Sequence, residues 1–406
     1  MIKEFLHRHG QSSDNIDAAA ATERVLDAMR AGLKGEGGSL AMLPTYLYEP
    51  DLSKTVNSDK KIIIDAGGTN FRSALGYFKD GKAVFEKVEK TVMPASDREL
   101  SKDEFYAAIA GKVERLLEDG GDIGFCFSYP VRMGADKDGV MCGATKELKA
   151  KGVNGTKVGD STLQAIKKYS AKQRKIVILN DTVATLLGGT VCADKKYSAY
   201  IGYIYGTGIN LAYLERVGGD GRRMIINTEC GNFDGFAQGD YDKKVAEETA
   251  NPEAYRFEKM TSGKYLASVI AECAYGAESE GLVGKLKRIP FTLKDVTEFL
   301  DGGEGAYIEN FLPEDRAKAK ELAEELVRRA AKAGAVVNAA AAIKSAEPKG
   351  LPVAIVAEGT TFERLTGYKE LFIEYLTELL APSGITFELV KGEDANMLGS
   401  LAAALS

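Results

Sequence analysis

The sequence predicts an α/β fold in which two related halves share one ligand site. Strand patterns alternate with amphipathic helical patterns along the chain. In addition, two strand–turn–strand units of one design, Lys61–Arg72 and Tyr200–Glu215, begin about 140 residues apart. Their similarity suggests a duplicated architecture with two glycine turns facing one polyphosphate. Two separate structural hairpins are the alternative.

The first unit joins a buried strand to a glycine turn. Ile62–Ile64 are consecutive β-branched residues, which is typical of a strand buried on both faces. Asp65 ends the strand, Gly67 and Gly68 let backbone N–H groups approach an anion, and Thr69 adds a hydroxyl. This predicts a phosphate-binding turn suited to a Mg-nucleotide, although the glycine pair alone favours an ordinary hairpin. The second unit carries comparable residues: Gly206, Thr207, Gly208 and Asn210.

Composition narrows the class of protein. At 406 residues the chain is long enough for two or three domain-sized units. The net charge of −6 and the pI near 5.4 argue against nucleic acid or an anionic membrane as a partner. No apolar run approaches the ~20 residues of a membrane span. The charged segment 1–11 is not expected to be a secretory signal.

Cysteine and histidine usage limits the chemistry. Five dispersed cysteines without CxxC spacing predict reduced thiols and a cytoplasmic location. The only histidines, His7 and His9, are expected to be disordered or surface residues of the N-terminal segment. Ser-His-Asp and Cys-His catalysis are therefore excluded from the body of the chain, as is a histidine-rich metal site. Any general base must be a carboxylate.

The first half is predicted to form one α/β unit over residues 60–180. A helix over 12–33, capped by Ser13 or Asp14, and an extended connection over 40–46 precede it. A capping box at Ser101 and Glu104 opens a helix through Leu117. The other predicted elements are strands over 62–64, 71–78, 83–92, 123–127 and 176–179 and a helix over 161–169.

The second half begins with a helix over 182–188 and the second glycine hairpin, followed by a helical region over 242–276. Pro313 opens a long alanine-rich helix that ends near Ala346. Its Lys-rich and Ala-rich faces are expected to meet solvent, with a partner surface as the alternative. The last predicted elements are strands over 352–357 and 385–390 and helices over 368–381 and 397–405. Because no low-complexity linker separates the halves, they should share a cleft.

Four strands end at polar or glycine clusters: Asp65, Ser128, the pair Asn180 and Asp181, and Gly206. Ligands of open α/β sheets bind beyond strand ends, so we expect these clusters to converge. Asp181 alone, at a helix start, is best interpreted as an N-cap. Beside two phosphate turns it is better interpreted as the general base of a phosphoryl transfer.

Two glutamates are candidate sugar ligands. Glu229 lies in a polar run over 227–232, and Glu258 lies in the following helical region. A carboxylate suits sugar hydroxyls because it accepts two hydrogen bonds in a fork. Taken alone, Glu258 is expected to be a solvated helix residue.

Taken together and in order, several segments resemble the hexokinase/glucokinase family of the actin-like ATPase fold. Each motif is weak alone, but the ordered set from about residue 40 to 265 is specific, with a further similarity at 359–361. The segments are Leu43-Pro44-Thr45-Tyr46, Asp65 to Arg72, Phe125 to Pro130, Thr145-Lys146, Asn180-Asp181, Gly206 to Asn210, Asn227 to Gly231, and Asn251-Pro252 with Phe257-Glu258-Lys259.

The resemblance implies a two-domain actin-like ATPase (ribonuclease H-like) sugar kinase fold, a ligand cleft between a small and a large domain, and a Mg-ATP-dependent hexokinase with glucose as first candidate. It implies a small domain over 60–180, completed by the helix 395–406, and a large domain over 12–59 and 181–394.

The implied catalytic residues are Asp181 and Lys146. The implied substrate-binding residues are Ser128, Thr145, Lys146, Asn180, Asp181, Asn210, Glu229 and Glu258. The implied nucleotide-binding residues are Asp65, Gly67, Gly68, Thr69, Asn70, Arg72, Gly206, Thr207, Gly208, Gly359 and Thr360, with Asp65 also holding Mg²⁺ through water.

The sequence also departs from the family pattern. Cys230 replaces the usual Trp, Glu253-Ala254-Tyr255 replaces Gly-Gln-Gln, and the Gly-Ser-Gly-Lys-Gly run near the C-terminus is absent. These changes leave open which hexose is preferred and which nucleotide base is selected. Alternatives are a sugar-sensing protein without turnover, a kinase of another hexose, and an actin-like filament or chaperone ATPase. A monomer or a homodimer fits the sequence equally.

Overall fold

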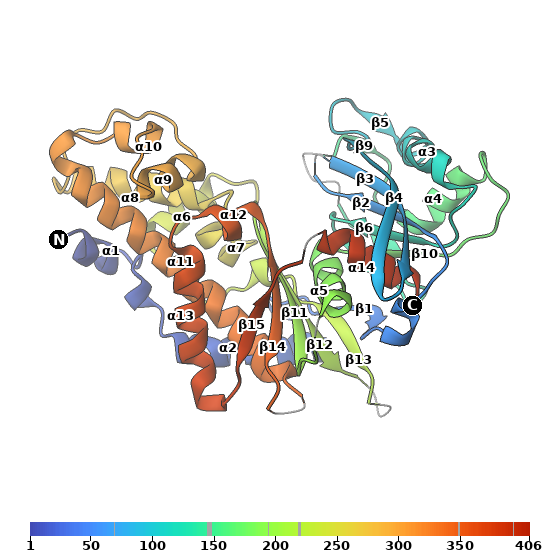
Figure 1. The fold of residues 1–406 in the computed structure, drawn as a ribbon. Helices are drawn as coiled ribbons and strands as arrows, with labels where there is room; N and C mark the ends of the chain where they lie inside the picture. Colours follow the sequence, from blue (N-terminus) through green and yellow to red (C-terminus); the bar gives the residue numbers. More distant parts are fainter. Residues whose placement is uncertain (69, 144–147, 194, 218–220, 348–349, 393) are drawn as a thin grey trace.

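Two β-sheets form the framework of the protein in a computed structural model that describes residues 1–68, 70–143, 148–193, 195–217, 221–347, 350–392 and 394–406. One sheet has the strand order β10-β6-β2-β3-β4, and the other has the order β1-β13-β12-β11-β14-β15 (Figure 1). The strands of the first are β2 (Lys61–Ala66), β3 (Asn70–Lys79), β4 (Lys82–Val92), β6 (Ile123–Phe127) and β10 (Ile176–Leu179). Those of the second are β1 (Leu43–Tyr48), β11 (Ala199–Tyr205), β12 (Ile209–Arg216), β13 (Arg223–Asn227), β14 (Val353–Glu358) and β15 (Phe387–Val390).

The two sheets repeat one topology. β2 pairs antiparallel with β3 and parallel with β6, which in turn pairs parallel with β10. In the same way, β11 pairs antiparallel with β12 and parallel with β14, which pairs parallel with β15. Each series continues with one more antiparallel strand, β4 or β13. The expected duplicated architecture is therefore confirmed, with β1 as an additional edge strand.

Two helices complete the repeat, because α5 (Asp181–Cys192) follows β10 and α14 (Ala395–Ala404) follows β15. They pack against each other between the two sheets (Figure 1), and α14 also contacts β2 and β6. Gly399 permits this close crossing, since a Cβ there would lie 2.0 Å from the carbonyl oxygen of Ala184. The ends of the two repeats are thereby held beside each other.

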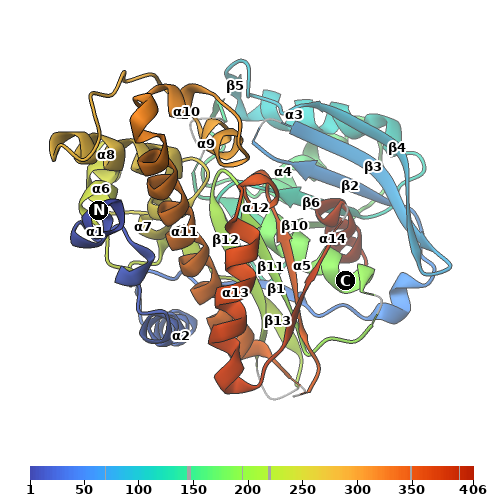
Figure 2. The same cartoon turned by 60° about the vertical axis from the view of Figure 1, so that its left-hand side comes forward.

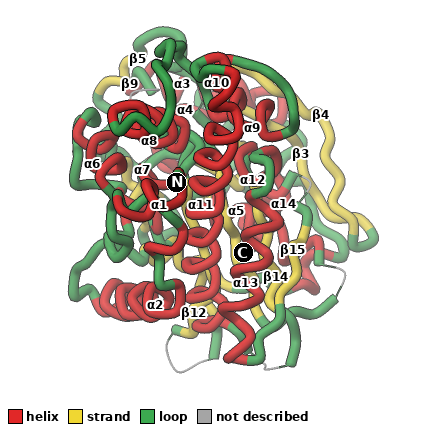
Figure 3. Tube along the Cα trace, turned by 90° about the vertical axis from the view of Figure 1, so that its left-hand side faces the viewer, coloured by secondary structure: helices red, strands yellow, loops and turns green. Residues whose placement is uncertain are grey.

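The alanine-rich helix α11 (Arg316–Ser345) lies in the interior. It packs against β11 and β12, α13 (Tyr368–Leu380) and α2 (Ala18–Lys34), as Figure 3 also shows. All its alanines between 330 and 342 are fully buried, so the expected solvent exposure of this face is wrong. Small side chains let neighbouring backbones approach closely, and burying many of them stabilises the core.

Two expected helices have different boundaries. The helix expected over 12–33 begins only at Ala18, because Ser12 caps a separate 3-10 turn (Ser13–Asn15) and Asp17 caps α2. The helical region expected over 242–276 is divided into α6 (Asp240–Glu247), α7 (Arg256–Thr261) and α8 (Leu266–Ser279). Pro252 lies in the first break, and Gly263, against the second glycine turn, lies in the other.

The N-terminal segment is folded, and of its two histidines His7 is exposed, as expected, whereas His9 is half-buried. Helix α1 (Ile2–Arg8) buries Phe5 and Leu6. The ring of His9 lies between two carboxylates, with Nδ1 2.8 Å from Asp240 Oδ2 and Nε2 2.7 Å from Glu280 Oε1. Partial burial lowers the pKa of His9, but the hydrogen bonds to both carboxylates outweigh it and raise the pKa.

The remaining elements are shorter. They are α3 (Lys102–Val113), α4 (Val158–Ile166), α9 (Leu293–Leu300), α10 (Ala306–Glu309), α12 (Thr360–Arg364), β5 (Leu100–Ser101), β7 (Val131–Met133), β8 (Gly139–Met141) and β9 (Ala150–Lys151). The capping box before α3 is present as expected, with Ser101 and Glu104 each bonded to the other's backbone N–H. Within the described ranges, no helix has the length and apolar character needed to cross a membrane.

Candidate active site

Three polar clusters converge at one edge of the five-stranded sheet. In the register of β2, β6 and β10, Asp65 and Leu179 are both partners of Cys126. The strands are parallel, so Asp65, Ser128 after β6, and Asp181 after β10 lie along the same edge. The expected convergence is thus confirmed for these three of the four predicted strand ends.

Asp181 is the first residue of α5 and not its N-cap. The N-cap is Asn180, whose side-chain oxygen accepts the N–H of Thr182 at 2.9 Å. Asp181 Oδ1 accepts the same N–H at 2.8 Å. Burial and the nearby negative charge of Asp65 raise the pKa of Asp181, while hydrogen bonds from Thr182 and Ser128 lower it; the net direction is upward. A carboxylate with a raised pKa is a stronger base, as general-base chemistry requires.

Asp65 is fixed by an arginine. Arg72 donates from Nε and Nη2 to Asp65 Oδ2 at 2.8 and 2.7 Å and from Nη1 to Asp394 Oδ1 at 2.8 Å. Arg72 thus joins the first glycine hairpin to the start of α14. The hydroxyl of Tyr129 donates to the carbonyl oxygens of Gly67 and Gly68 at 3.2 and 3.3 Å, which holds the turn in place.

A second cluster faces this edge from the six-stranded sheet. Asn227 Nδ2 donates to Glu229 Oε1 at 2.7 Å, and Asn210 Nδ2 lies 2.9 Å from Asn227 Oδ1 and 3.4 Å from Glu229 Oε1. Burial raises the pKa of Glu229, and the negative charge of Asp181 adds to this effect. The charge of Asp181 therefore acts on Glu229 across the gap between the two sheets' strand ends, so the two clusters lie near each other.

Glu258 belongs to the same site and is not a solvated residue. Its Oε2 accepts the N–H of Ile209 at 3.3 Å. A Cβ on Gly208 would lie 2.7 Å from this oxygen, so Glu258 reaches the second glycine turn. Burial raises the pKa of Glu258, and the charge of Glu229 also raises it.

The second glycine turn connects this cluster to a separate pocket. The carbonyl oxygen of Gly206 accepts the hydroxyl of Thr361 at 3.0 Å and the N–H of Gly263 at 2.9 Å. Gly359 has φ 122°, and a Cβ there would lie 2.2 Å from the carbonyl oxygen of Tyr205. Helix α12 therefore begins directly against the ends of β11 and β14 (Figure 2).

The pocket beside this turn has a volume of about 900 Å³. It contains two predicted nucleotide residues, Thr207 and Thr360, and several charged residues that the sequence analysis did not identify: Lys264, Lys294, Glu298, Asp301 and Arg364. No pattern in the sequence marks the residues of α9, whereas Lys264 lies just beyond the matched segment that ends in Lys259. A pocket of this size, lined by charged and apolar side chains, has room for a nucleoside next to a phosphate-binding turn.

Glu358, at the end of β14, was also missed. Burial raises its pKa to about 7; Arg72 opposes this effect, and the negative charges of Asp65 and Asp181 add to it. The backbone N–H of Ala395 donates to its carboxylate. The strand-end rule that identified Asp65 and Asp181 would have found Glu358 if it had been applied to β14 as well.

Replacing Glu358 with glutamine is expected to stabilise the protein at alkaline pH. Between the usual pKa of 4.5 and about 7, the folded state binds more protons than the unfolded state, so its stability falls as pH rises. Glu358→Gln removes this loss and should raise the free energy of unfolding by about 3 kcal/mol at about pH 8, with little change at about pH 4.5. Urea denaturation at both pH values, without Mg²⁺ or nucleotide, measures the difference. The exposed Glu363→Gln is the control; equal stability of Glu358→Gln and wild type at about pH 8 would refute this account.

A divalent cation fits beside Asp65. Within the described part of the chain, no group of three or more His, Cys, Asp and Glu side chains is arranged to hold a metal. A cation here would therefore take most ligands from water and phosphate oxygens, which is the usual coordination of Mg²⁺. Asp65, Asp181 and Glu358 offer hard oxygen donors whose mutual repulsion such a cation would relieve.

Three predicted site residues, Thr69, Thr145 and Lys146, lie outside the described residues.

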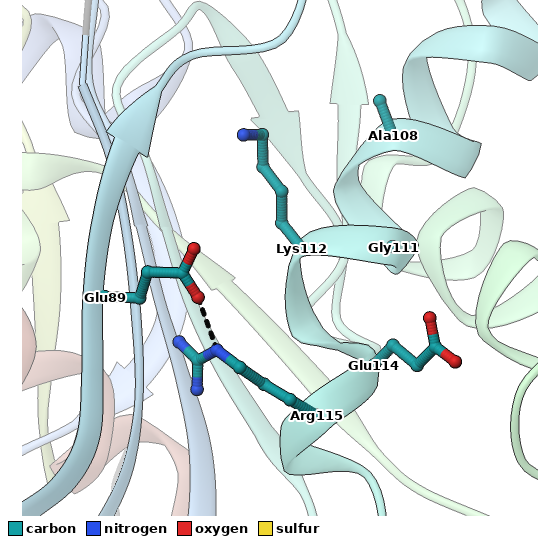
Figure 4. Close-up of a pocket in the computed structure, with 6 residues that line it drawn as sticks. All are labelled: Glu89, Ala108, Gly111, Lys112, Glu114 and Arg115. Atoms are coloured by element: carbon teal, nitrogen blue, oxygen red, sulfur yellow. Dashed lines mark hydrogen bonds and ion pairs between the residues drawn. The ribbon is translucent and has the colours of Figure 1, made fainter.

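A different recess, between β4 and α3, has a volume of about 630 Å³ and contains none of the predicted site residues (Figure 4). There, Arg115 Nε donates to Glu89 at 2.5 Å, and Lys112 donates to Thr91 at 2.8 Å. Its basic groups are thus already engaged by the protein.

Comparison with known proteins places the chain among hexokinases. A family model described as hexokinase matches residues 200–406, and a second one with that description matches residues 1–191. The chain is 31% identical over 428 residues to hexokinase HKDC1 of Mus musculus, which covers 94% of this chain and 46% of that protein. It is 28% identical over 449 residues to hexokinase-7 of Oryza sativa subsp. japonica, and this match covers 97% of this chain and 93% of that protein. The chain spans about half the length of the first curated relatives it matches.

Solved structures agree on the fold. The hexokinase from Schistosoma mansoni complexed with glucose superposes with a TM-score of 0.81 at 22% identity, covering 100% of this chain and 99% of that one. Another hexokinase crystal structure gives a TM-score of 0.83 at 20% identity, covering 100% and 98%. The expected α/β, two-domain actin-like sugar kinase fold is confirmed.

Proposed function

This chain belongs to the hexokinase family, and on that premise we propose that it is an ATP-dependent hexokinase. It transfers the γ-phosphoryl group of Mg-ATP to the 6-hydroxyl of a hexose, with glucose as the first candidate. The observation that carries the proposal is the position of Asp181. This carboxylate has a raised pKa, begins α5 at the sheet edge that also carries Asp65, and acts electrostatically on Glu229, which supports a site where a sugar hydroxyl would meet a phosphoryl group.

Asp181 acts as the general base. It accepts the proton of the attacking hydroxyl while the new oxygen–phosphorus bond forms and the bond to the β-phosphate oxygen breaks, releasing ADP. Polar side chains of both clusters hold the other hydroxyls: Ser128, Asn180, Asn210, Glu229 and Glu258. The family resemblance assigns Thr145 and Lys146, which lie outside the described residues, to the sugar and the transferred phosphoryl group.

The nucleotide lies across the second glycine turn. Its nucleoside occupies the pocket that includes Thr207, Lys264 and Thr360, and its phosphates approach the turns 67–70 and 206–208, with Gly359 behind the second turn. Arg72 fixes the orientation of Asp65, which would hold Mg²⁺ through water. Mg²⁺ would neutralise part of the negative charge of the phosphates.

Closure of the two domains excludes water from the site. The small domain consists of residues 60–180 and the helix 395–406, and the large domain of residues 12–59 and 181–394. Their packing through α5 and α14 gives closure a hinge. The enzyme acts in the cytoplasm as a monomer or a homodimer.

The experiment is a coupled assay of ADP release with Mg-ATP and glucose, fructose, mannose, N-acetylglucosamine or no sugar. ADP release that depends on a sugar supports the kinase, and the relative rates rank its substrates. Glucose binding by calorimetry without ADP release would instead favour a sugar-sensing protein. ADP release that requires a hexose other than glucose would change the proposed substrate but would still support the proposed reaction.

A further inference from the structure

Arg72 is held at both edges of its guanidinium group. Nε and Nη2 donate to Asp65 Oδ2, and Nη1 donates to Asp394 Oδ1 at 2.8 Å. Because the N–H donors of a guanidinium group lie in one rigid plane, a bond at one edge also fixes the direction in which the other edge points. The orientation of the donors that reach Asp65 therefore depends on Asp394.

Asp394 reaches Arg72 from an unusual backbone position. It is the N-cap of α14, with φ 53° and ψ 35°, in the left-handed region that few residues other than glycine adopt. An aspartate N-cap usually accepts a hydrogen bond from the first turn of its own helix, but this carboxylate makes no such bond. Asp394 also lies in the segment 392–399, which stands where the family's Gly-Ser-Gly-Lys-Gly run is absent. Neither helix capping nor the family pattern therefore explains the bond to Arg72.

The two neighbours of Arg72 in the sheet are an acid and a base. Arg72 lies opposite Asp65 of β2 on one side and opposite Lys90 of β4 on the other. Lys90 carries the same charge as Arg72, so it repels the guanidinium group and does not fix it. Asp394 supplies a negative charge at the edge of the guanidinium group that points away from Asp65.

We infer that Asp394 is a positioning residue, which through Arg72 holds Asp65 in the orientation that binds the Mg²⁺ of the nucleotide. The inference deepens the proposed function and rests on it. Both donors of Arg72 engage the same oxygen of Asp65, so a rotation of the guanidinium group turns this carboxylate. Partners that orient a ligating side chain tune the affinity for the metal. Loss of Asp394 should therefore weaken the binding of nucleotide with Mg²⁺ and leave the binding of nucleotide alone unchanged.

Asp394→Gly tests the inference, because glycine adopts the left-handed backbone without strain. Calorimetric titration with ADP, once with Mg²⁺ and once with EDTA in its place, measures the affinity for each form of the nucleotide. The variant should bind Mg-ADP about 5-fold more weakly, while its affinity for ADP without Mg²⁺ and for glucose changes less than about 2-fold. Asp394→Asn keeps an oxygen that can accept from Nη1 of Arg72, so its loss should be smaller.

Asp80→Gly is the matched control. Asp80 has φ 51°, is exposed, and lies in the turn that follows β3, at the end of this strand opposite to Arg72. The same substitution there relieves the same backbone strain without removing a partner of Arg72. It should change the affinity for Mg-ADP less than about 2-fold. An equal loss in both variants would show a general effect on the fold and would overturn the inference.

A double-mutant cycle with Asp65→Asn tests whether Asp394 acts through Asp65. If it does, Asp394→Gly should weaken Mg-ADP binding much less in the Asp65→Asn background than in wild type. Equal losses in both backgrounds, wild-type Mg-ADP affinity in Asp394→Gly, or equal binding of ADP by wild type with and without Mg²⁺ would overturn the inference. The coupled assay tests the proposed function separately. A wild type that binds Mg-ADP but releases no ADP with any sugar would refute the kinase, and the cycle would still decide the role of Asp394.

Discussion

Asp181→Ala is expected to reduce turnover by about 10² to 10⁴-fold, the range that removal of one proton-transfer group produces. Sugar binding should persist, because the asparagine and glutamate side chains of the Glu229 cluster remain. The expected signature is a large fall in kcat with a much smaller change in glucose affinity. Single-turnover kinetics with Mg-ATP, together with calorimetric titration of glucose, measure both quantities.

Asp181→Asn and Glu229→Gln provide the controls. The asparagine variant keeps the shape of Asp181 and its contact with Thr182 but cannot act as a base, so it should be as slow as the alanine variant. Glu229→Gln should instead weaken sugar binding. The raised pKa of Asp181 predicts that kcat of wild type falls on the acid side of neutrality as the carboxylate becomes protonated. Near wild-type turnover by either Asp181 variant would reject Asp181 as the base.

Asp242→Ala is expected to cause the largest loss of stability, about 3–5 kcal/mol. Asp242 is fully buried and accepts from Arg329 Nη1 and Nη2 at 2.8 and 2.7 Å, and Arg329 is only 1% exposed. Arg329 lies in the middle of α11, so the pair joins this central helix to α6. Removing the carboxylate leaves a guanidinium buried without its counterion. Urea denaturation should show a lower midpoint with an unchanged slope.

Two further variants test the cause of this loss. Glu324→Ala removes an exposed partner of Lys320, 3.8 Å away, and should change stability by less than about 0.5 kcal/mol. Replacing Asp242 and Arg329 together with leucine and methionine should recover much of the loss, because no charge is then stranded. A wild-type midpoint for Asp242→Ala would contradict the buried pair.

The sequence identified those parts of the site that local patterns encode. Strands β2 and β10 are runs of β-branched and aliphatic residues, and the residue that follows such a run marks a sheet edge, which located Asp65 and Asp181. The repeated glycine hairpins correctly indicated the repeated sheet topology. Glu229 was identified from its polar run and Asn210 from the second glycine hairpin, and in the structure Asn210 Nδ2 lies 3.4 Å from Glu229 Oε1.

The remaining features depend on contacts between distant segments. The solvent exposure of α11 was mispredicted because alanine and lysine give no clear apolar stripe, and only the packing of α13 and the sheet reveals which face is buried. His9 is ordered by carboxylates more than 230 residues away, Asp240 and Glu280. Lys264 is held beside the second glycine turn by Thr207, whose carbonyl oxygen accepts its backbone N–H at 3.1 Å. The residues that neighbour each of these positions in the sequence do not indicate such contacts.

The most direct measurement is phosphorus NMR of a reaction that contains the protein, Mg-ATP and glucose. The account predicts that a hexose 6-phosphate resonance and ADP appear in equal amounts, and that neither forms with 6-deoxyglucose. ATP that stays intact beside bound glucose, or a phosphoryl group on a different hydroxyl, would contradict the assignment of Asp181 and the Glu229 cluster to one kinase site.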